Sequence, residues 1–136
     1  MLNPAEAYGK AAKMATGAPR ELEGTLLIKA ASQLQRVKEG WPDSRRELNA
    51  ALIYNRKLWT IFASSAAEND HPLPKEIKQN IANLAVFIFK HTTKVEAEPA
   101  PERLDTLINI NRQIAAGLFQ KTGAPQGNSA EAVMGG

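Results

Sequence analysis

The residues of this chain that could do chemistry are few and widely separated. The sequence has no cysteine and two histidines, His71 in a turn-forming stretch and His91 near the end of a helical stripe. Neither histidine has a second metal ligand at helical spacing, so a metal site has little support. The carboxylates lie scattered on polar faces, with no pair in an apolar setting that would shift a pKa. Because a glycine-rich phosphate loop and a nucleophile elbow are also absent, we predict that the protein is not an enzyme and needs no metal or cofactor.

A more informative set of polar residues lies inside apolar helical stripes. Asparagine is a poor helix former and is costly to bury without hydrogen bonds. Two interpretations stay open: the amides bridge helices inside the core, or some of them line a groove and bind a partner. Tyrosine and tryptophan share this ambiguity, because both are common in cores and at interface hot spots. The candidate partner-binding residues are Tyr54, Asn55, Trp59, Asn80, Asn83, Phe87, Asn109, Asn111 and Arg112.

The elements that must position these residues are helices. In the segment 46–65, one series of residues recurs at steps of four, three, four and three, which is the spacing of a helix face. The series is Leu48, Leu52, Asn55, Trp59 and Phe62. No glycine or proline interrupts the segment, and Asp43 or Ser44 is the expected N-cap. A helix with so wide an apolar side must be covered by other elements, so we place it in a bundle.

Proline and glycine divide the rest of the chain into further helices. Asn3-Pro4 opens a short one, Pro19 starts the next, Pro74 lies in the first turn of another, and the last runs over about 103–120. No strand alternation is evident. We therefore predict an all-α fold, a compact bundle of about five helices over residues 3–120, followed by a disordered C-terminal tail at 121–136 that is rich in small and helix-breaking residues.

The segment 84–89, LAVFIF, is apolar on every side of its helix, since successive side chains are about 100° apart. Either this helix lies at the centre of the bundle, or one of its faces is kept for a partner. It is far shorter than the roughly 20 residues that a membrane span needs, so we expect no membrane insertion. The start of the chain lacks the pattern of a cleaved signal peptide, and we expect a cytoplasmic protein.

The charge of the chain gives little support to nucleic-acid binding. The 136 residues suit one domain and carry a net charge of +3, with the lysines and arginines spread among acids. A nucleic-acid surface usually shows a clustered basic stripe or a known reading module. RNA binding is therefore the less favoured interpretation.

Long strings in the sequence resemble the FlaF family of flagellar biosynthesis proteins. They are YNRKLWTIF at 54–62, HPLPKEIKQNIANLAVFIFKHT at 71–92 and LININRQIAAGL at 107–118, with NPAEAYGKAAK and PRELEGTLLIKAA earlier in the chain. The likeness covers about residues 3–120. It implies a cytoplasmic protein needed for flagellin production and export, functionally paired with FlbT and without known catalytic residues.

Two activities fit this resemblance. In the first, the protein is an export chaperone that binds flagellin and promotes its synthesis and secretion. In the alternative, it is a post-transcriptional regulator that acts on flagellin mRNA, alone or with FlbT. For the first activity we expect helix-in-groove binding of an amphipathic flagellin segment. The expected groove lies beside 81–89 and the LININ helix, with Tyr54, Asn55 and Trp59 on one wall.

Overall fold

The computed structural model describes residues 19–68 and 73–120. These residues form α2 (Pro19–Glu39), η1 (Asp43–Glu47), α3 (Leu48–Ala66), α4 (Lys75–Ala97), η2 (Pro101–Arg103) and α5 (Leu104–Phe119), where η denotes a 3-10 helix. The predicted all-α class is confirmed, since the described residues contain no strand. They contain four α-helices and not five. The fifth predicted helix, at Asn3-Pro4, and the predicted tail at 121–136 lie outside the described residues.

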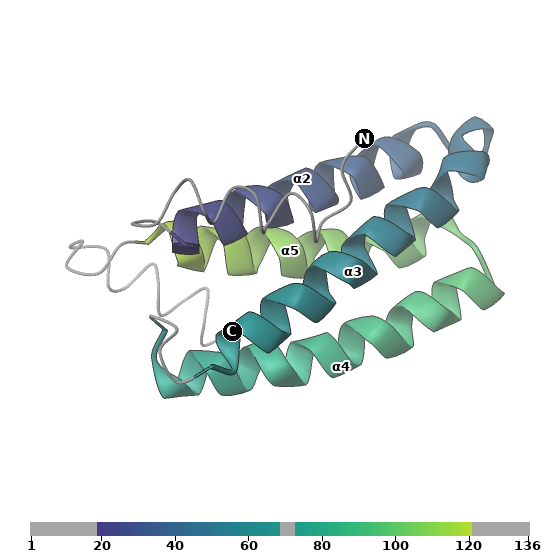
Figure 1. Cartoon of the computed structure of the whole chain (residues 1–136). Helices are drawn as coiled ribbons and strands as arrows, with labels where there is room; N and C mark the ends of the chain where they lie inside the picture. Colours follow the sequence, from purple (N-terminus) through teal and green to yellow (C-terminus); the bar gives the residue numbers. More distant parts are fainter. Residues whose placement is uncertain (1–18, 69–72, 121–136) are drawn as a thin grey trace.

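The four helices form two neighbouring pairs. Figure 1 shows α5 running alongside α2 and α4 running alongside α3, with α2 and α3 joined at the η1 corner. The main helix–helix packing is therefore between α2 and α5, between α2 and α3, and between α3 and α4. Although α4 and α5 follow each other in the chain, each packs chiefly on a helix of its own pair.

The core is built from the apolar stripes that the sequence pattern predicts. Trp59 and Phe62 of α3 are fully buried, and their rings meet edge to face with centroids 5.3 Å apart. Buried aliphatic side chains of the other helices surround them, including Leu27, Leu34, Ile81, Ile88, Leu104 and Leu107. Full burial of one such side chain stabilises the fold by about 1.5–3 kcal/mol, so the stripes hold the bundle together.

The turn between α2 and α3 corrects one prediction. Neither Asp43 nor Ser44 caps α3, because the 3-10 helix η1 intervenes and α3 begins at Leu48. The buried Ser44 hydroxyl instead donates a hydrogen bond to the carbonyl oxygen of Val37 near the end of α2. This bond fastens η1 back onto α2.

Candidate functional site

A chain of side-chain hydrogen bonds crosses the core between α3 and α5. The indole Nε1 of Trp59 donates to Oδ1 of Asn111 at 2.8 Å, and Nδ2 of Asn111 donates to Oδ1 of Asn55 at 2.7 Å. All three residues are 0% exposed. The Nδ2 of Asn55 has no hydrogen-bond partner among the described residues. The two amides thus bridge helices inside the bundle, which is the first of the two interpretations left open by the sequence.

The prediction that Asn55 and Trp59 form the wall of a partner groove is therefore wrong, and Asn111 is likewise excluded from such a surface. A side chain with no exposed area cannot touch a docked helix while the bundle is closed. The physical reason is that the indole N–H and the two amides hydrogen-bond to one another, with only Nδ2 of Asn55 left unpaired among the described residues. These bonds lower the desolvation cost of placing polar groups on apolar stripes.

Tyr54 is buried as well, but on a different side of α3. The ammonium group of Lys29 lies 5.7 Å from the centre of its ring. Its hydroxyl has no hydrogen-bond partner among the described residues. Burial raises the pKa of the Tyr54 phenol above its ordinary value of about 10.

The remaining predicted site residues are exposed but do not converge. Asn80, Asn83 and Phe87 lie on α4, whereas Asn109 and Arg112 lie on α5. On α4, Nε2 of Gln79 donates to Oδ1 of Asn83 at 3.2 Å, and on α5 a guanidinium nitrogen of Arg112 reaches Oε1 of Gln35 on α2 at 3.4 Å. Because α4 and α5 belong to different helix pairs, these five residues do not line one groove.

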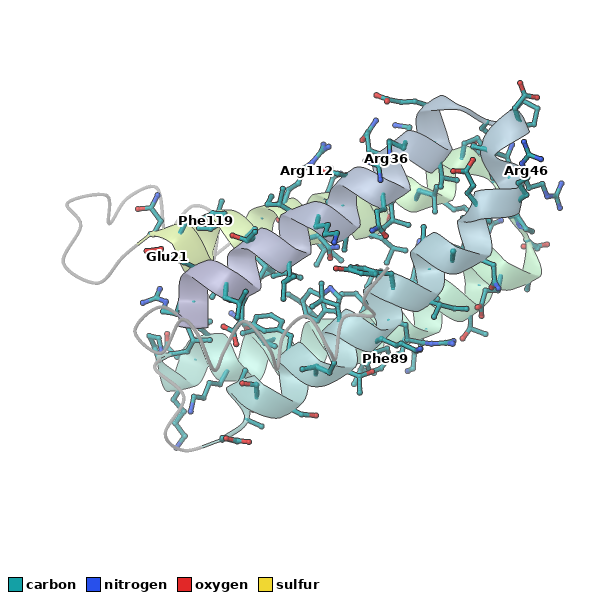
Figure 2. The ribbon with its side chains drawn as sticks, turned by 45° about the horizontal axis from the view of Figure 1, so that its top comes forward. Glu21, Arg36, Arg46, Phe89, Arg112 and Phe119 are labelled. Atoms are coloured by element: carbon teal, nitrogen blue, oxygen red, sulfur yellow. The ribbon has the colours of Figure 1, made fainter. Side chains whose placement is uncertain are left out.

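The outward face of α4 carries the two most exposed large apolar residues of the described helices. Val86 is 53% exposed and Phe87 is 44% exposed, although they lie next to each other in the middle of a 23-residue helix. The opposite face of α4 is buried, and it comprises Ile81, Ala85, Ile88, Thr92 and Val95. Phe89 is partly buried where α4 runs beside α3 (Figure 2). Helix α4 is therefore peripheral, and the LAVFIF segment turns one apolar side to solvent.

The exposed phenyl ring is held in place. Phe87 stacks on the imidazole of His91, with ring centres 5.6 Å apart and planes 14° from parallel. The Nε2 of His91 donates a hydrogen bond to the carbonyl oxygen of Arg103 at 2.8 Å. His91 is half-buried, and these two contacts tie the position of Phe87 to the residue that precedes α5.

Two surface features were not singled out from the sequence. The first is Val86: the LAVFIF string by itself does not say which of its sides faces outward, but the helical stripe that continues beyond the string, through Ile81 and Val95, excludes Val86 and is the signal that would have found it. The second feature is a cleft between α2 and α3 that brings Arg36 and Arg46 to Tyr54. The turn at η1 assembles it, and no local motif marks it.

Within residues 19–68 and 73–120, no group of three or more His, Asp or Glu side chains could hold a metal ion. None of the helices described is both long enough and apolar enough to cross a membrane.

The described residues define the class of protein: a small all-helical bundle with a buried polar network. An apolar side of its peripheral helix, α4, is left uncovered by the other described helices. The family model described as flagellar protein FlaF matches residues 4–118, and the chain belongs to this family. The resemblance noted in the sequence is thereby confirmed. No curated protein and no solved structure matches the chain.

Proposed function

We propose that this protein is a cytoplasmic export chaperone that binds flagellin and promotes its synthesis and secretion, without catalytic activity. Membership of a flagellar protein family supports a role in the flagellar system. The observation that carries the binding role is the pair Val86 and Phe87, about half exposed at the centre of the outward face of α4. Apolar surface at this position of a folded protein is typical of a partner-binding site.

The outward side of α4 suits packing against a second helix. Apolar side chains at its centre are flanked along the same face by polar and basic ones, an arrangement that helix-on-helix recognition uses. The exposed residues along this side are Gln79, Asn80, Asn83, Val86, Phe87, Lys90 and Lys94. The proposed site therefore keeps Asn80, Asn83 and Phe87 of the sequence prediction and replaces its groove by a helix face.

The flagellin segment proposed to bind there is one of its terminal amphipathic helices, which are disordered before assembly. Full burial of a Val or Phe side chain is worth about 1.5–3 kcal/mol, so covering the exposed halves of Val86 and Phe87 together contributes roughly the same, about 1.5–3 kcal/mol. A disordered client also loses conformational entropy when it orders on binding. Moderate affinity and ready release follow, which suits the transfer of cargo to an export apparatus.

The test is a matched pair of variants in a flagellin-binding assay by calorimetry. Phe87→Ala should weaken binding about tenfold, because losing the cover of half a phenyl ring costs roughly 1.4 kcal/mol. Phe119→Ala is the control, since Phe119 is 43% exposed but lies on α5 beside the start of α2 (Figure 2). Equal effects of the two variants, or none from Phe87→Ala, would contradict the proposed site.

The same assay separates the alternative activity on flagellin mRNA, alone or with FlbT. An RNA complex weakens steeply as salt rises, because phosphate contacts release counterions. Binding through Val86 and Phe87 should change little between low and high salt and should survive nuclease treatment. Loss of all flagellin contact after nuclease treatment would favour the RNA-dependent mechanism instead.

A further inference from the structure

A second surface feature lies away from α4, in the angle where α2 turns through η1 into α3. It is an open cleft of about 310 Å³. Its lining residues come from α2, η1 and the first half of α3, and they are Gln33, Arg36, Val37, Arg46, Glu47, Ala50, Ala51 and Tyr54. Figure 2 marks Arg36 on α2 and Arg46 at the η1 corner, on the two sides of this angle.

The donors of the cleft have no partner among the residues that the structure describes. Among the described residues, neither Arg36 nor Arg46 forms an ion pair or a side-chain hydrogen bond, whereas the adjacent Arg45 lies over the Trp41 ring at 5.8 Å. Tyr54 is 94% buried, at 6% exposure, and its hydroxyl is also without a hydrogen-bond partner there. A buried hydroxyl left unpaired has lost its hydrogen bonds to water without replacement, and a ligand that accepts its hydrogen bond would offset this loss.

We propose that this cleft binds the carboxylate of an aspartate or glutamate side chain presented by a protein partner. The two guanidinium groups, the Tyr54 hydroxyl and the Gln33 amide supply donors, and a carboxylate supplies only acceptors. The methyl groups of Ala50 and Ala51 and the side chain of Val37 give an apolar wall for the methylene groups of an acidic side chain.

The charge balance favours a carboxylate over a phosphate. The lining carries two positive charges, on Arg36 and Arg46, and one negative charge on Glu47, which leaves a net charge of +1. A single carboxylate neutralises this charge, whereas a phosphate would carry the larger charge of about −1.5 to −2 and would be repelled by Glu47. This site is independent of the proposed flagellin surface, because no residue of α4 lines it.

The test is a nuclear magnetic resonance titration of the full chain with a blocked tetraglutamate peptide. Parallel titrations use sodium phosphate and sodium chloride at matched ionic strength. We expect saturable shifts from the peptide at Gln33, Arg36, Arg46 and the Tyr54 ring, with phosphate binding at least fivefold weaker. Shifts that match those from chloride would overturn the site, and tighter binding of phosphate would overturn the assignment to a carboxylate.

Single substitutions test which residues of the cleft bind the peptide. Arg36→Gln and Arg46→Gln remove the positive charge and shorten the side chain while keeping its first two methylene groups, and each should weaken peptide binding at least fivefold. Arg45→Gln is the matched control, since Arg45 is in the same short helix but lies against Trp41, and it should leave binding within twofold. Tyr54→Phe deletes one oxygen and should weaken binding about threefold with the melting temperature unchanged or raised. An unchanged affinity in Tyr54→Phe, or an equal loss in Arg45→Gln, would overturn the proposal.

Discussion

Replacing Asn111 by leucine should destabilise the bundle more than the same replacement of Asn55. In Asn111→Leu, the indole N–H of Trp59 loses its acceptor and Oδ1 of Asn55 loses its donor, while Nδ2 of Asn55 is already unpaired among the described residues. Each buried group left unsatisfied costs about 1–3 kcal/mol, so the expected loss for the two groups is about 2–6 kcal/mol. Leucine has the same number of side-chain heavy atoms as asparagine and a similar branched shape, so it leaves no cavity, although its methyl groups are bulkier than the amide.

Asn55→Leu should change the free energy of unfolding less, because it has two opposing effects. It leaves Nδ2 of Asn111 without an acceptor, but it also removes the unpaired Nδ2 of Asn55 from the core. The hydrogen bond from Trp59 to Asn111 survives. The two changes partly cancel, and the net loss should be about 0–2 kcal/mol.

The double variant is the decisive measurement. With both residues replaced by leucine, the Trp59 N–H alone loses its partner, so the loss should be about 1–3 kcal/mol. The double variant should thus be more stable than Asn111→Leu, an inversion that additive effects cannot produce. Urea unfolding followed by circular dichroism at 222 nm measures all three free energies. Equal losses in the two single variants, or a double variant whose loss is their sum, would refute the network as the reason for these asparagines.

Two other residues give independent predictions. Ser44→Ala removes the buried hydrogen bond to the Val37 carbonyl and should lower the free energy of unfolding by about 1–2 kcal/mol, measured by urea denaturation; no change would show that the bond does not hold η1 to α2. Because burial raises the pKa of Tyr54, the folded state keeps the phenol proton longer than the unfolded state. Stability should therefore be complete below about pH 10 and fall as the pH rises through the folded-state pKa, and this alkaline loss should be smaller in Tyr54→Phe when melting temperatures are compared.

The helices could be predicted from the sequence because their signals are local. The stripe from Leu27 to Val37 and the stripe of α5 have the period of a helix, and proline or glycine marks where several elements begin or end. The bond from Ser44 to Val37 was missed because side-chain capping of α3 was the simpler expectation for the same residue. A 3-10 turn in that place depends on how α3 packs against α2, which no local pattern contains.

Neither the buried hydrogen-bond network nor the exposed face of α4 could be predicted from the sequence, because both depend on how the helices pack. Asn111 meets Trp59 and Asn55, its partners 52 and 56 positions away, only after α5 has packed into the bundle. An asparagine on an apolar stripe gives the same sequence pattern whether its amide hydrogen-bonds to a core residue or to a binding partner. Phe87 and Phe89 stand two positions apart in one apolar string, and the placement of α4 against α3 decides that Phe87 is the more exposed.

The size of the α4 surface constrains the partner binding proposed above. A specific protein interface buries about 800 Å² on each partner, more than Val86 and Phe87 alone can supply. The polar residues along the same face must therefore be covered too, and a helix of 23 residues, roughly 35 Å long, offers enough length for this. The stacking of Phe87 on His91 fixes the central aromatic ring beforehand, which lowers the entropy lost on binding. A fixed aromatic anchor within a mostly polar face favours recognition of one helix and its release over permanent association.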